Sequence, residues 1–369
     1  MLLPENQRLM SLDALRGFDM FFIMGGQGIV LALCTIFPGW FSDAVTTQMG
    51  HVEWDGFAFY DMIFPLFLFL AGVSFPFSLA GSLRKGVGRS RIYKQIVRRG
   101  IILVALGLVY NGLFALNFAE LRYASVLGRI GVAWMLAAII FMNVDARRII
   151  WIVAGILLFY WGLIGLFPAP DAPAGFGPYT FEGNLVGYID RLLLPGRLYN
   201  GTFDPEGILS TIPAVCTALL GMLAGRIVRN EGKSGNSKAL MLAATGAALV
   251  IAGLVWSLGM PINKSLWSSS YVCFAGGLSF MLFALFYYVV DVLSLRLWAF
   301  FFTVIGVNSI TIYLGQRIIN FSSIANFFSR GLVRLSPELV QGLISSVFFV
   351  AISWLFLYFL YRKKIFLRV

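Results

Sequence analysis

The chain contains a single histidine, and acidic residues follow it closely. His51 begins the stretch "HVEWDGFAFYDMIFP", in which Glu53, Asp55 and Asp61 lie within ten residues of it. A neutral imidazole can take a proton from an attacking amine or can itself attack a carbonyl carbon, and a nearby carboxylate can orient the ring. A lone histidine in a loop is more often an ordinary surface residue. Because acidic and aromatic residues surround it here, we take His51 and Asp61 as candidate catalytic residues.

The composition predicts the class of protein that must position these residues. Hydrophobic residues make up 59% of the 369-residue chain and charged residues only 12%, about half the charged fraction of a soluble domain. Only helices or closed barrels satisfy their backbone groups in a bilayer, and a span needs ~20 apolar residues. The apolar runs are continuous and do not alternate as barrel strands do. We therefore predict an all-α polytopic membrane bundle.

Hydrophobic runs predict about ten transmembrane helices joined mostly by short loops. The expected spans are 18–37, 57–80, 99–116, 124–142, 149–167, 208–226, 239–257, 270–290, 298–316 and 339–361. Neither a repeat nor a composition shift indicates a second domain, so residues 1–369 are expected to form a single transmembrane domain. One longer connection, near 168–207, contains Asp190 and Glu206. It is either a solvated connector or a surface that binds an acceptor.

The distribution of basic residues predicts the orientation of the chain. Most of the 28 lysine and arginine residues fall in alternate loops, among them Arg8, Arg16, the segment 84–99 and the C-terminal segment 362–368. Basic residues in short loops stay on the cytoplasmic side. We therefore expect both termini in the cytoplasm and His51 on the opposite face. The net charge of +11 then reflects topology and attraction to the lipid bilayer, and it requires no nucleic acid.

Polar residues at membrane depth are further candidates, because ionisable groups are costly there. Asp61 and Arg129 lie within expected spans, and they could either act in catalysis or simply pair with each other. In "VIGVNSITIYLGQRI" helical spacing places Asn308, Thr311 and Gly315 on one face and Ser309 on the next. Such a polar face can hold helices together or line a wet pocket.

Several motifs, in order along the chain, carry a resemblance to a known family. They are "RLMSLDALRGFDM" (8–20), "HVEWDGFAFYDMIFP" (51–65), "LRYASVLGRIGV" (121–132), "GYIDRLLLPGRLY" (187–199), "FDPEGILSTIPAV" (203–215), "PINKSLWSSSYV" (261–272) and "GVNSITIYLGQ" (306–316). Together they resemble the heparan-alpha-glucosaminide N-acetyltransferase family of transmembrane acetyltransferases. The chain looks like a shorter bacterial form without the lumenal domain. In place of the asparagine that precedes the histidine in the lysosomal enzymes, this chain offers Gln27 as an amide.

The resemblance implies that acetyl-CoA binds from the cytoplasm and that its acetyl group passes to an amino sugar on the other face. It implies a bacterial inner-membrane location and makes a homodimer a candidate assembly. His51 would either form an acetyl-imidazole or deprotonate the acceptor amine for direct attack. Because the sequence has one histidine, a two-histidine metal site is excluded, and we expect no metal.

Further site residues are expected from these motifs and from charge. Asn308 is expected to act in catalysis with His51 and Asp61, by donating to the thioester oxygen as its charge builds up. The expected acceptor-binding residues are Trp54, Asp190, Glu206, Lys264, Trp267 and Ser309, and the expected CoA-binding residues are Arg16 and Arg129. The main alternative is a glycan or lipid transporter or flippase that uses the same polar cavity without acyl transfer. A purely structural bundle is disfavoured by the polar groups at depth.

Overall fold

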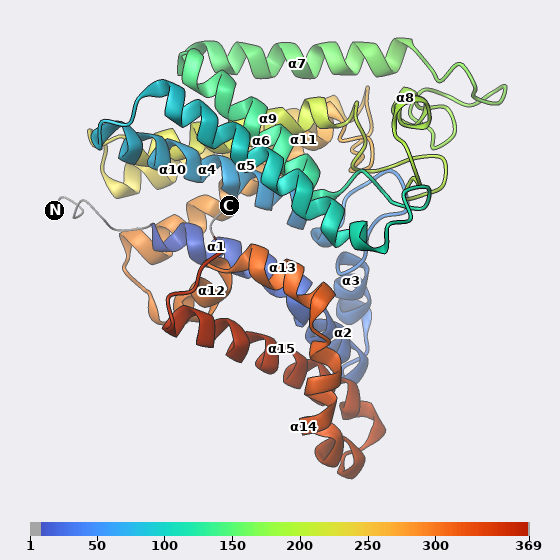
Figure 1. Ribbon diagram of the computed structural model, residues 1–369, viewed down its shortest axis with the longest axis vertical. Coiled ribbons are helices and arrows are strands. Elements are labelled where there is room, and N and C mark those ends of the chain that lie inside the picture. Colours follow the sequence, from blue (N-terminus) through green and yellow to red (C-terminus); the bar gives the residue numbers. More distant parts are fainter. Residues whose placement is uncertain (1–8, 368–369) are drawn as a thin grey trace. The chain divides into compact units, whose positions relative to one another are not determined.

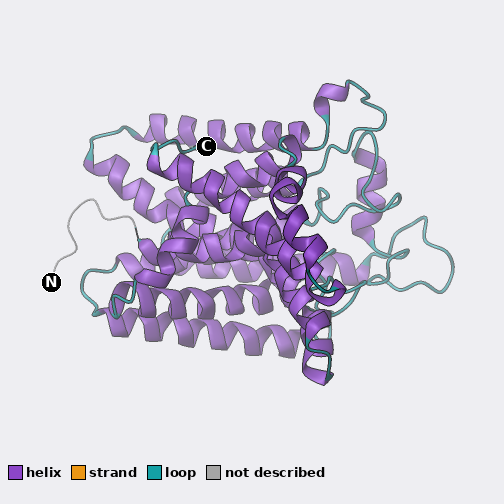
Figure 2. Cartoon of the chain, turned by 90° about the horizontal axis from the view of Figure 1, so that it is seen from below, coloured by secondary structure: helices purple, strands orange, loops and turns teal. Residues whose placement is uncertain are grey.

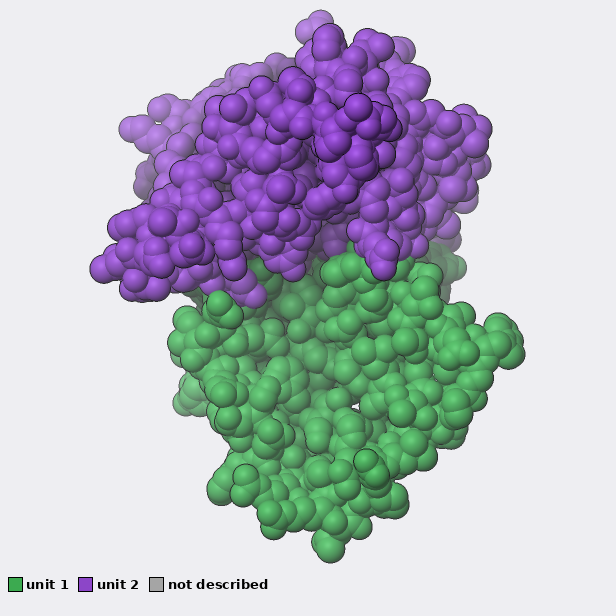
Figure 3. All heavy atoms as spheres, turned by 90° about the vertical axis from the view of Figure 1, so that its right-hand side faces the viewer, with its two compact units in different colours: residues 1–51, 58–63, 282–368 green, residues 52–57, 64–281, 369 purple. Residues whose placement is uncertain are grey.

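The computed structural model describes residues 9–367, so Arg8 lies outside the described residues. In this range the regular structure is helical, apart from one isolated antiparallel bridge between Arg122 and Gly196. The ribbon views show helices joined by loops (Figures 1 and 2). The expected all-α architecture is confirmed. Two compact units divide the chain (Figure 3), and His51 belongs to the first of them.

Unit 1 is drawn from Met1–His51, Ala58–Ile63 and Leu282–Arg368. Its helices are α1 (Met10–Phe21), the π-helix η1 (Phe22–Gly26), α2 (Gln27–Ile36), α3 (Trp40–Gln48), the 3₁₀ turn η2 (Phe59–Met62), the π-helix η4 (Tyr287–Val292), α12 (Leu297–Gly306), α13 (Ser309–Ile318), α14 (Phe321–Leu335) and α15 (Glu338–Arg362).

A close crossing of α1 and α12 organises unit 1. A Cβ on Gly17 would collide with the carbonyl oxygen of Phe302, and a Cβ on Gly306 would collide with that of Asp13. Each glycine thus lies against the carbonyl of the residue four positions before the other glycine. This arrangement fits two parallel helices in which Gly17 and Gly306 lie at the same level. Small residues allow such close backbone approach in membrane bundles. Rings of Phe18, Phe21 and Phe302 pack edge to face beside the crossing.

Unit 2 comprises Val52–Phe57 and Phe64–Met281. Its helices are α4 (Ile63–Arg84), α5 (Arg89–Tyr110), the 3₁₀ turn η3 (Leu113–Ala115), α6 (Val126–Asn143), α7 (Ala146–Leu166), α8 (Leu185–Leu193), α9 (Thr211–Arg229), α10 (Gly235–Trp256) and α11 (Ser269–Phe286), the last of which continues past Leu282 into unit 1.

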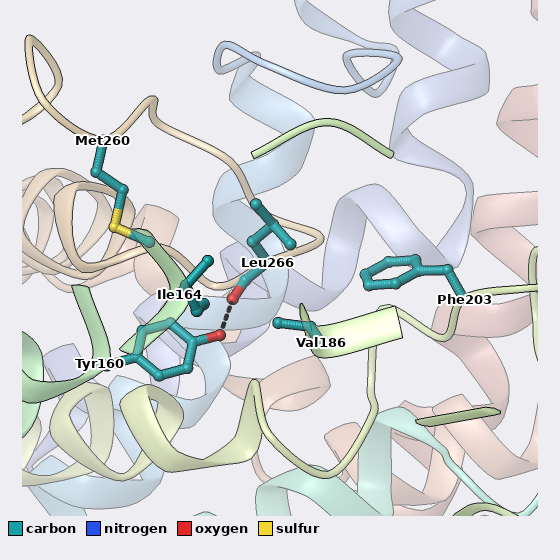
Figure 4. Packing of buried hydrophobic residues seen from close by; sticks show 6 residues of the cluster. All are labelled: Tyr160, Ile164, Val186, Phe203, Met260 and Leu266. Atoms are coloured by element: carbon teal, nitrogen blue, oxygen red, sulfur yellow. Dashed lines mark hydrogen bonds between the residues drawn. The ribbon is translucent and has the colours of Figure 1, made fainter. Parts of the chain in front are cut away.

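The core of unit 2 forms around α4 and α9. Gly72 of α4 lies against the backbone of Ala218, and Gly221 of α9 lies against the backbone of Phe69, so these two helices also approach closely. A second buried cluster joins the end of α7 to the loops: Tyr160 donates a hydrogen bond from its hydroxyl to the Leu266 carbonyl at 2.6 Å (Figure 4). That bond satisfies a buried polar group that the apolar cluster could not.

Eight helical runs in the described chain are long and apolar enough to cross a membrane. They are Met10–Ile36, Phe59–Arg84, Val126–Asn143, Ala146–Leu166, Thr211–Arg229, Gly235–Trp256, Ser269–Val292 and Glu338–Arg362. The protein is therefore an integral membrane protein. The helix expected at 99–116 is α5, which starts at Arg89 and carries basic residues through its first half. The count of ten spans and the cytoplasmic termini stay predictions.

The expected span 298–316 is broken. α12 and α13 are bent by 57° relative to each other and together would form a ninth span. The break falls at Asn308, whose backbone (φ −124°, ψ 26°) departs from helical values. Its N–H donates to the carbonyl of Ile305, three residues back, at 3.1 Å, and so ends α12 in a tight turn. Asn308 therefore does not continue the helical face of Thr311 and Gly315 that the spacing suggested.

The crossing of α1 and α12 predicts a sharp difference between two glycine substitutions. Gly306→Ala places a methyl group against backbone, which cannot move aside as a side chain can, and should destabilise unit 1 by ~3 kcal/mol or more. Gly331→Ala in α14 meets no atom within 4 Å and should be neutral or stabilising by up to ~1 kcal/mol. Thermal unfolding in detergent measures both. Equal melting temperatures would contradict the close crossing.

Candidate functional site

The backbone on both sides of His51 is held by glutamine side chains of unit 1. Gln27, at the start of α2, donates from Nε2 to the carbonyl of Met49 at 2.7 Å, and Met49 caps the end of α3. Gln48 accepts from the N–H of Phe59 at 2.9 Å. These bonds tie the end of α3 to α2 and to η2. The amide of Gln27 thus supports the segment leading to His51, two residues away from it.

Asp61 uses each carboxylate oxygen for a different bond. Oδ2 accepts from the N–H of Ala58 at 3.1 Å and so caps η2, while Oδ1 lies 2.6 Å from Nδ1 of His51. The side chain of Asp61 is 1% exposed and that of His51 is 55% exposed. Because an ionised carboxylate can only accept, Nδ1 carries the proton in the neutral ring. Nε2 then carries the lone pair that a general base or nucleophile requires.

Two residues near this pair have no role in the sequence-based hypothesis. The ring of Tyr60 lies edge-on to His51, with 5.1 Å between centroids. Asp19, in α1, is a buried carboxyl, 2% exposed. The rings of Phe59 and Phe22, 4.9 Å apart, pack η2 against η1. The sequence did contain a sign of Asp19: it is a lone carboxylate inside the apolar run "GFDMFFIMGG". A carboxylate at that depth is costly in a bilayer.

The other expected site residues of unit 1 lie in α1 and at the start of α13. Arg16 donates to Oδ1 of Asp13 at 3.3 Å, one turn earlier in the helix. Asn308 and Ser309 are both buried at the break between α12 and α13. Oδ1 of Asn308 accepts from the Thr311 hydroxyl at 3.4 Å. The CoA-binding role of Arg16 and the roles of Asn308 and Ser309 stay predictions.

Trp54 anchors a loop cluster in unit 2. Its indole N–H donates to the carbonyl of Tyr179 at 2.7 Å, and its ring packs edge to face on Phe181 and Phe203. Asn263 donates from Nδ2 to the Trp54 carbonyl and to the carboxylate of Asp55, each at 3.0 Å. Trp54 therefore joins the segment after His51 to the long loop and to the loop after α10.

The segment containing Lys264 and Trp267 is largely buried. The indole of Trp267 is 1% exposed and donates to the Thr217 hydroxyl at 3.1 Å. Lys264 is half-buried three residues before it. An acceptor would reach Lys264 before Trp267, and their expected binding roles stay predictions.

Arg122, Asp204 and Glu206 form an ionic cluster that closes the long loop. Arg122 donates to both oxygens of Asp204, at 2.8 and 2.6 Å, and also binds Glu206. Its guanidinium lies over the ring of Tyr199, 4.6 Å from the centroid. Burial alone lowers the pKa of Arg122, but the hydrogen bond to Asp204 and the charges of Glu206 and Asp204 raise it above its usual value overall. The loop is thus held by a permanently charged arginine.

Asp190 and Arg129 lie beside this ionic cluster. Asp190 is fully buried; Oδ1 accepts from the N–H of Ile208 at 2.9 Å, whereas Oδ2 has no hydrogen-bond partner. Burial, opposed by the bond from Ile208 and reinforced by the charge of Asp204, raises the pKa of Asp190 to about 7.

Arg129 lies in α6 and is buried. It donates to the Ser210 hydroxyl and to the carbonyl of Gly207, and it lies over the Trp267 ring, 5.0 Å from the centroid. These contacts place it against the end of the long loop. Asp190 bonds to the N–H of Ile208, just past the loop, and Glu206 bonds to Arg122, in the connection before α6. Their expected acceptor and CoA roles stay predictions.

A mostly apolar groove lies on α5 and includes two basic residues. The groove has a volume of about 500 Å³ and is lined by Tyr93, Lys94, Val97, Arg98, Ile101 and Ile102. Lys94 and Arg98 belong to the 84–99 segment in which the sequence suggested CoA phosphates. Within residues 9–367, no group of three or more His, Cys, Asp or Glu side chains could hold a metal ion.

Comparison with known proteins connects this geometry to a family. A family model described as a domain of unknown function (DUF5009) matches residues 8–168. The chain is 28% identical to a heparan-alpha-glucosaminide N-acetyltransferase from Homo sapiens over 99% of its own length, and 27% identical to one from Mus musculus over the same share. Over nearly its whole length this chain is similar to the heparan-alpha-glucosaminide N-acetyltransferases. The resemblance inferred from the motifs is thereby confirmed.

The match to the N-acetyltransferases covers the whole bundle but only part of the relatives. The aligned region spans 62% of the length of each curated relative. It includes both units of this chain, and therefore His51 and Asp61 as well as the outer-loop residues. For this chain, the activity and substrates of the N-acetyltransferases are therefore a proposal.

The raised pKa of Asp190 predicts a pH-dependent stability. Its folded pKa lies above the unfolded value of 3.8, so its contribution to stability falls as pH rises from about 4 to about 7. Asp190→Asn should therefore come close to the wild type near pH 3.5 and be more stable by ~1–4 kcal/mol at pH 8. Melting temperatures at both pH values test this. Glu182→Gln, at an exposed position of the same loop, is the control for removing a carboxylate, and a stability difference that does not change with pH would contradict the burial effect.

Proposed function

We propose that this protein is a transmembrane acetyltransferase. It passes the acetyl group of acetyl-CoA, bound from the cytoplasmic side of a bacterial inner membrane, to the amino group of a glucosamine-like sugar on the other side. The apolar helices and the names of the homologues support the membrane location and the reaction class. The observation that carries the proposal is the hydrogen bond between Asp61 and Nδ1 of the only histidine.

In the proposed reaction His51 acts as a general base. Nε2 takes a proton from the acceptor amine while the amine nitrogen bonds to the acetyl carbon. The carbon–sulfur bond breaks, its electron pair stays on sulfur, and the proton passes from His51 to the thiolate. The positive charge that forms on the ring is stabilised by Asp61, whose burial strengthens the interaction. Both electrons and protons balance without a metal or a redox partner.

Direct transfer suits this geometry better than an acetyl-imidazole. The carboxylate at Nδ1 can stabilise the positive charge that a general base acquires during the reaction. An acetyl-imidazole would instead place the acetyl group on the exposed side of a half-exposed ring, where water could hydrolyse it. Incubation with radiolabelled acetyl-CoA but no acceptor distinguishes the two, because only the covalent route labels the protein.

Substitutions in the His51–Asp61 pair test the proposal. His51→Ala should lower kcat for acetyl transfer to glucosamine by ~10²–10⁴-fold, because the base is lost. Asp61→Asn should also lower kcat by at least ~10²-fold, because an amide can favour the wrong tautomer. Equilibrium binding of CoA should change little in either variant.

Asp43→Asn, on the exposed side of α3, is the matched control for the removal of a nearby carboxylate. Normal turnover in His51→Ala would overturn the proposal. A transporter or flippase would instead show sugar or lipid movement into vesicles that needs no acetyl-CoA, and no acetylated product at any pH.

A further inference from the structure

The groove on α5 lies between two rows of side chains. Each row follows the four-residue spacing of a helix ridge, and the rows are Tyr93, Val97, Ile101 and Lys94, Arg98, Ile102. The end of the groove nearer the start of α5 carries a phenol and two cations, whereas the other end is aliphatic. Long side chains of a helix point back toward its N-terminus, so Lys94 and Arg98 reach away from the aliphatic end. The groove is thus charged at one end and apolar at the other.

Contacts with α6 place this groove at the edge of the membrane. α5 and α6 pack against each other, and the hydroxyl of Tyr93 donates to Oδ1 of Asn143 at 2.8 Å. Asn143 is the last residue of α6, which is apolar enough to cross a membrane. A Cβ on Gly100 of α5 would lie 3.3 Å from the carbonyl oxygen of Gly131, well inside α6. The two helices therefore run antiparallel, and the groove begins level with the end of a span and continues inward.

Arg98 is a cation beyond the level of that end. It follows Tyr93 by five residues, or ~7 Å of helical rise, and its side chain is exposed. The next residue, Arg99, differs, because its guanidinium lies over the Trp134 ring, 4.2 Å from the centroid. A cation at membrane depth is costly unless an anion accompanies it or its side chain reaches the interface.

The neighbouring helices provide no anion for this groove. Neither α5 nor α6 contains an acidic residue. None of the ion pairs among residues 9–367 involves Lys94 or Arg98. The two side chains are one helical turn apart, which is close enough for a single anionic group to contact both.

A phospholipid with a net negative charge has the polarity that the groove requires. We propose that the groove binds one anionic phospholipid, with its phosphate between Lys94 and Arg98 and an acyl chain along the aliphatic end. Ammonium and guanidinium groups both donate to phosphate oxygens. A soluble phosphate, such as those of CoA, would fill only the basic end and leave the aliphatic side chains uncovered. The inference concerns lipid binding and does not depend on acetyl transfer.

Two lipids that differ in headgroup charge test the proposal. Phosphatidylglycerol and phosphatidylcholine with identical acyl chains are titrated into the full-length protein in detergent, and bound lipid is counted by native mass spectrometry. The wild type should bind phosphatidylglycerol at least ~10-fold more tightly, and Lys94→Gln/Arg98→Gln should reduce the preference to about twofold. Arg147→Gln/Arg148→Gln is the matched control, because it removes the same charge from exposed positions of α7; it should keep the preference.

The aliphatic end has its own test. Val97→Trp fills the groove but keeps both cations, so it should lower the affinity for both lipids by a similar factor. Neither glycerophosphoglycerol, which is the headgroup without acyl chains, nor CoA should displace bound phosphatidylglycerol.

Three outcomes would overturn the proposal. One is an unchanged preference for phosphatidylglycerol in folded, monodisperse Lys94→Gln/Arg98→Gln protein. Another is unchanged lipid binding in Val97→Trp. The third is displacement of the lipid by glycerophosphoglycerol or CoA, which would assign the basic end to a soluble phosphate. Acetyl transfer by the wild type tests the proposed function separately, and its absence would leave the lipid titration fully interpretable.

Discussion

The His51 site depends on the two bonds made by the carboxylate of Asp61. One oxygen closes the first turn of η2 and the other holds His51. Because the carboxylate is buried, no bulk water can replace these partners, and losing them would leave a charged group unsatisfied. The position of the imidazole is thus set by the same bond network that starts α4. His51 lies in a loop and is half-exposed, but its bond to the first turn of a helix fixes its orientation.

The sequence predicted the parts of this structure that follow from hydrophobicity. The helical membrane architecture and most spans agree with the apolar runs, because backbone groups in lipid have few alternatives. Asp61 was taken with His51 as a candidate catalytic residue because it is one of three carboxylates within ten residues of the histidine. Gln27 was noted only as an amide, since nothing in the sequence shows that α2 returns to the end of α3.

The features that the sequence did not predict arise from tertiary contacts. The break at Asn308 occurs inside a run that is apolar enough for one helix, so the hydrophobic pattern contains no sign of it. The sequence also gave no sign that Asp190 is buried, because a carboxylate in a Pro- and Gly-rich loop normally faces water. Its position follows from the cluster around Arg122, which joins residues far apart in the chain. Sequence spacing cannot bring such residues together.

The glycine crossing of α1 and α12 has a mechanical consequence. Because backbone packs directly on backbone at this crossing, the two helices lose contacts if they slide or separate. We therefore expect α1 and α12 to move together as one rigid body. Any change of shape within unit 1 is then confined to the points where helical hydrogen bonding is already irregular, η1 on one helix and the Asn308 break on the other.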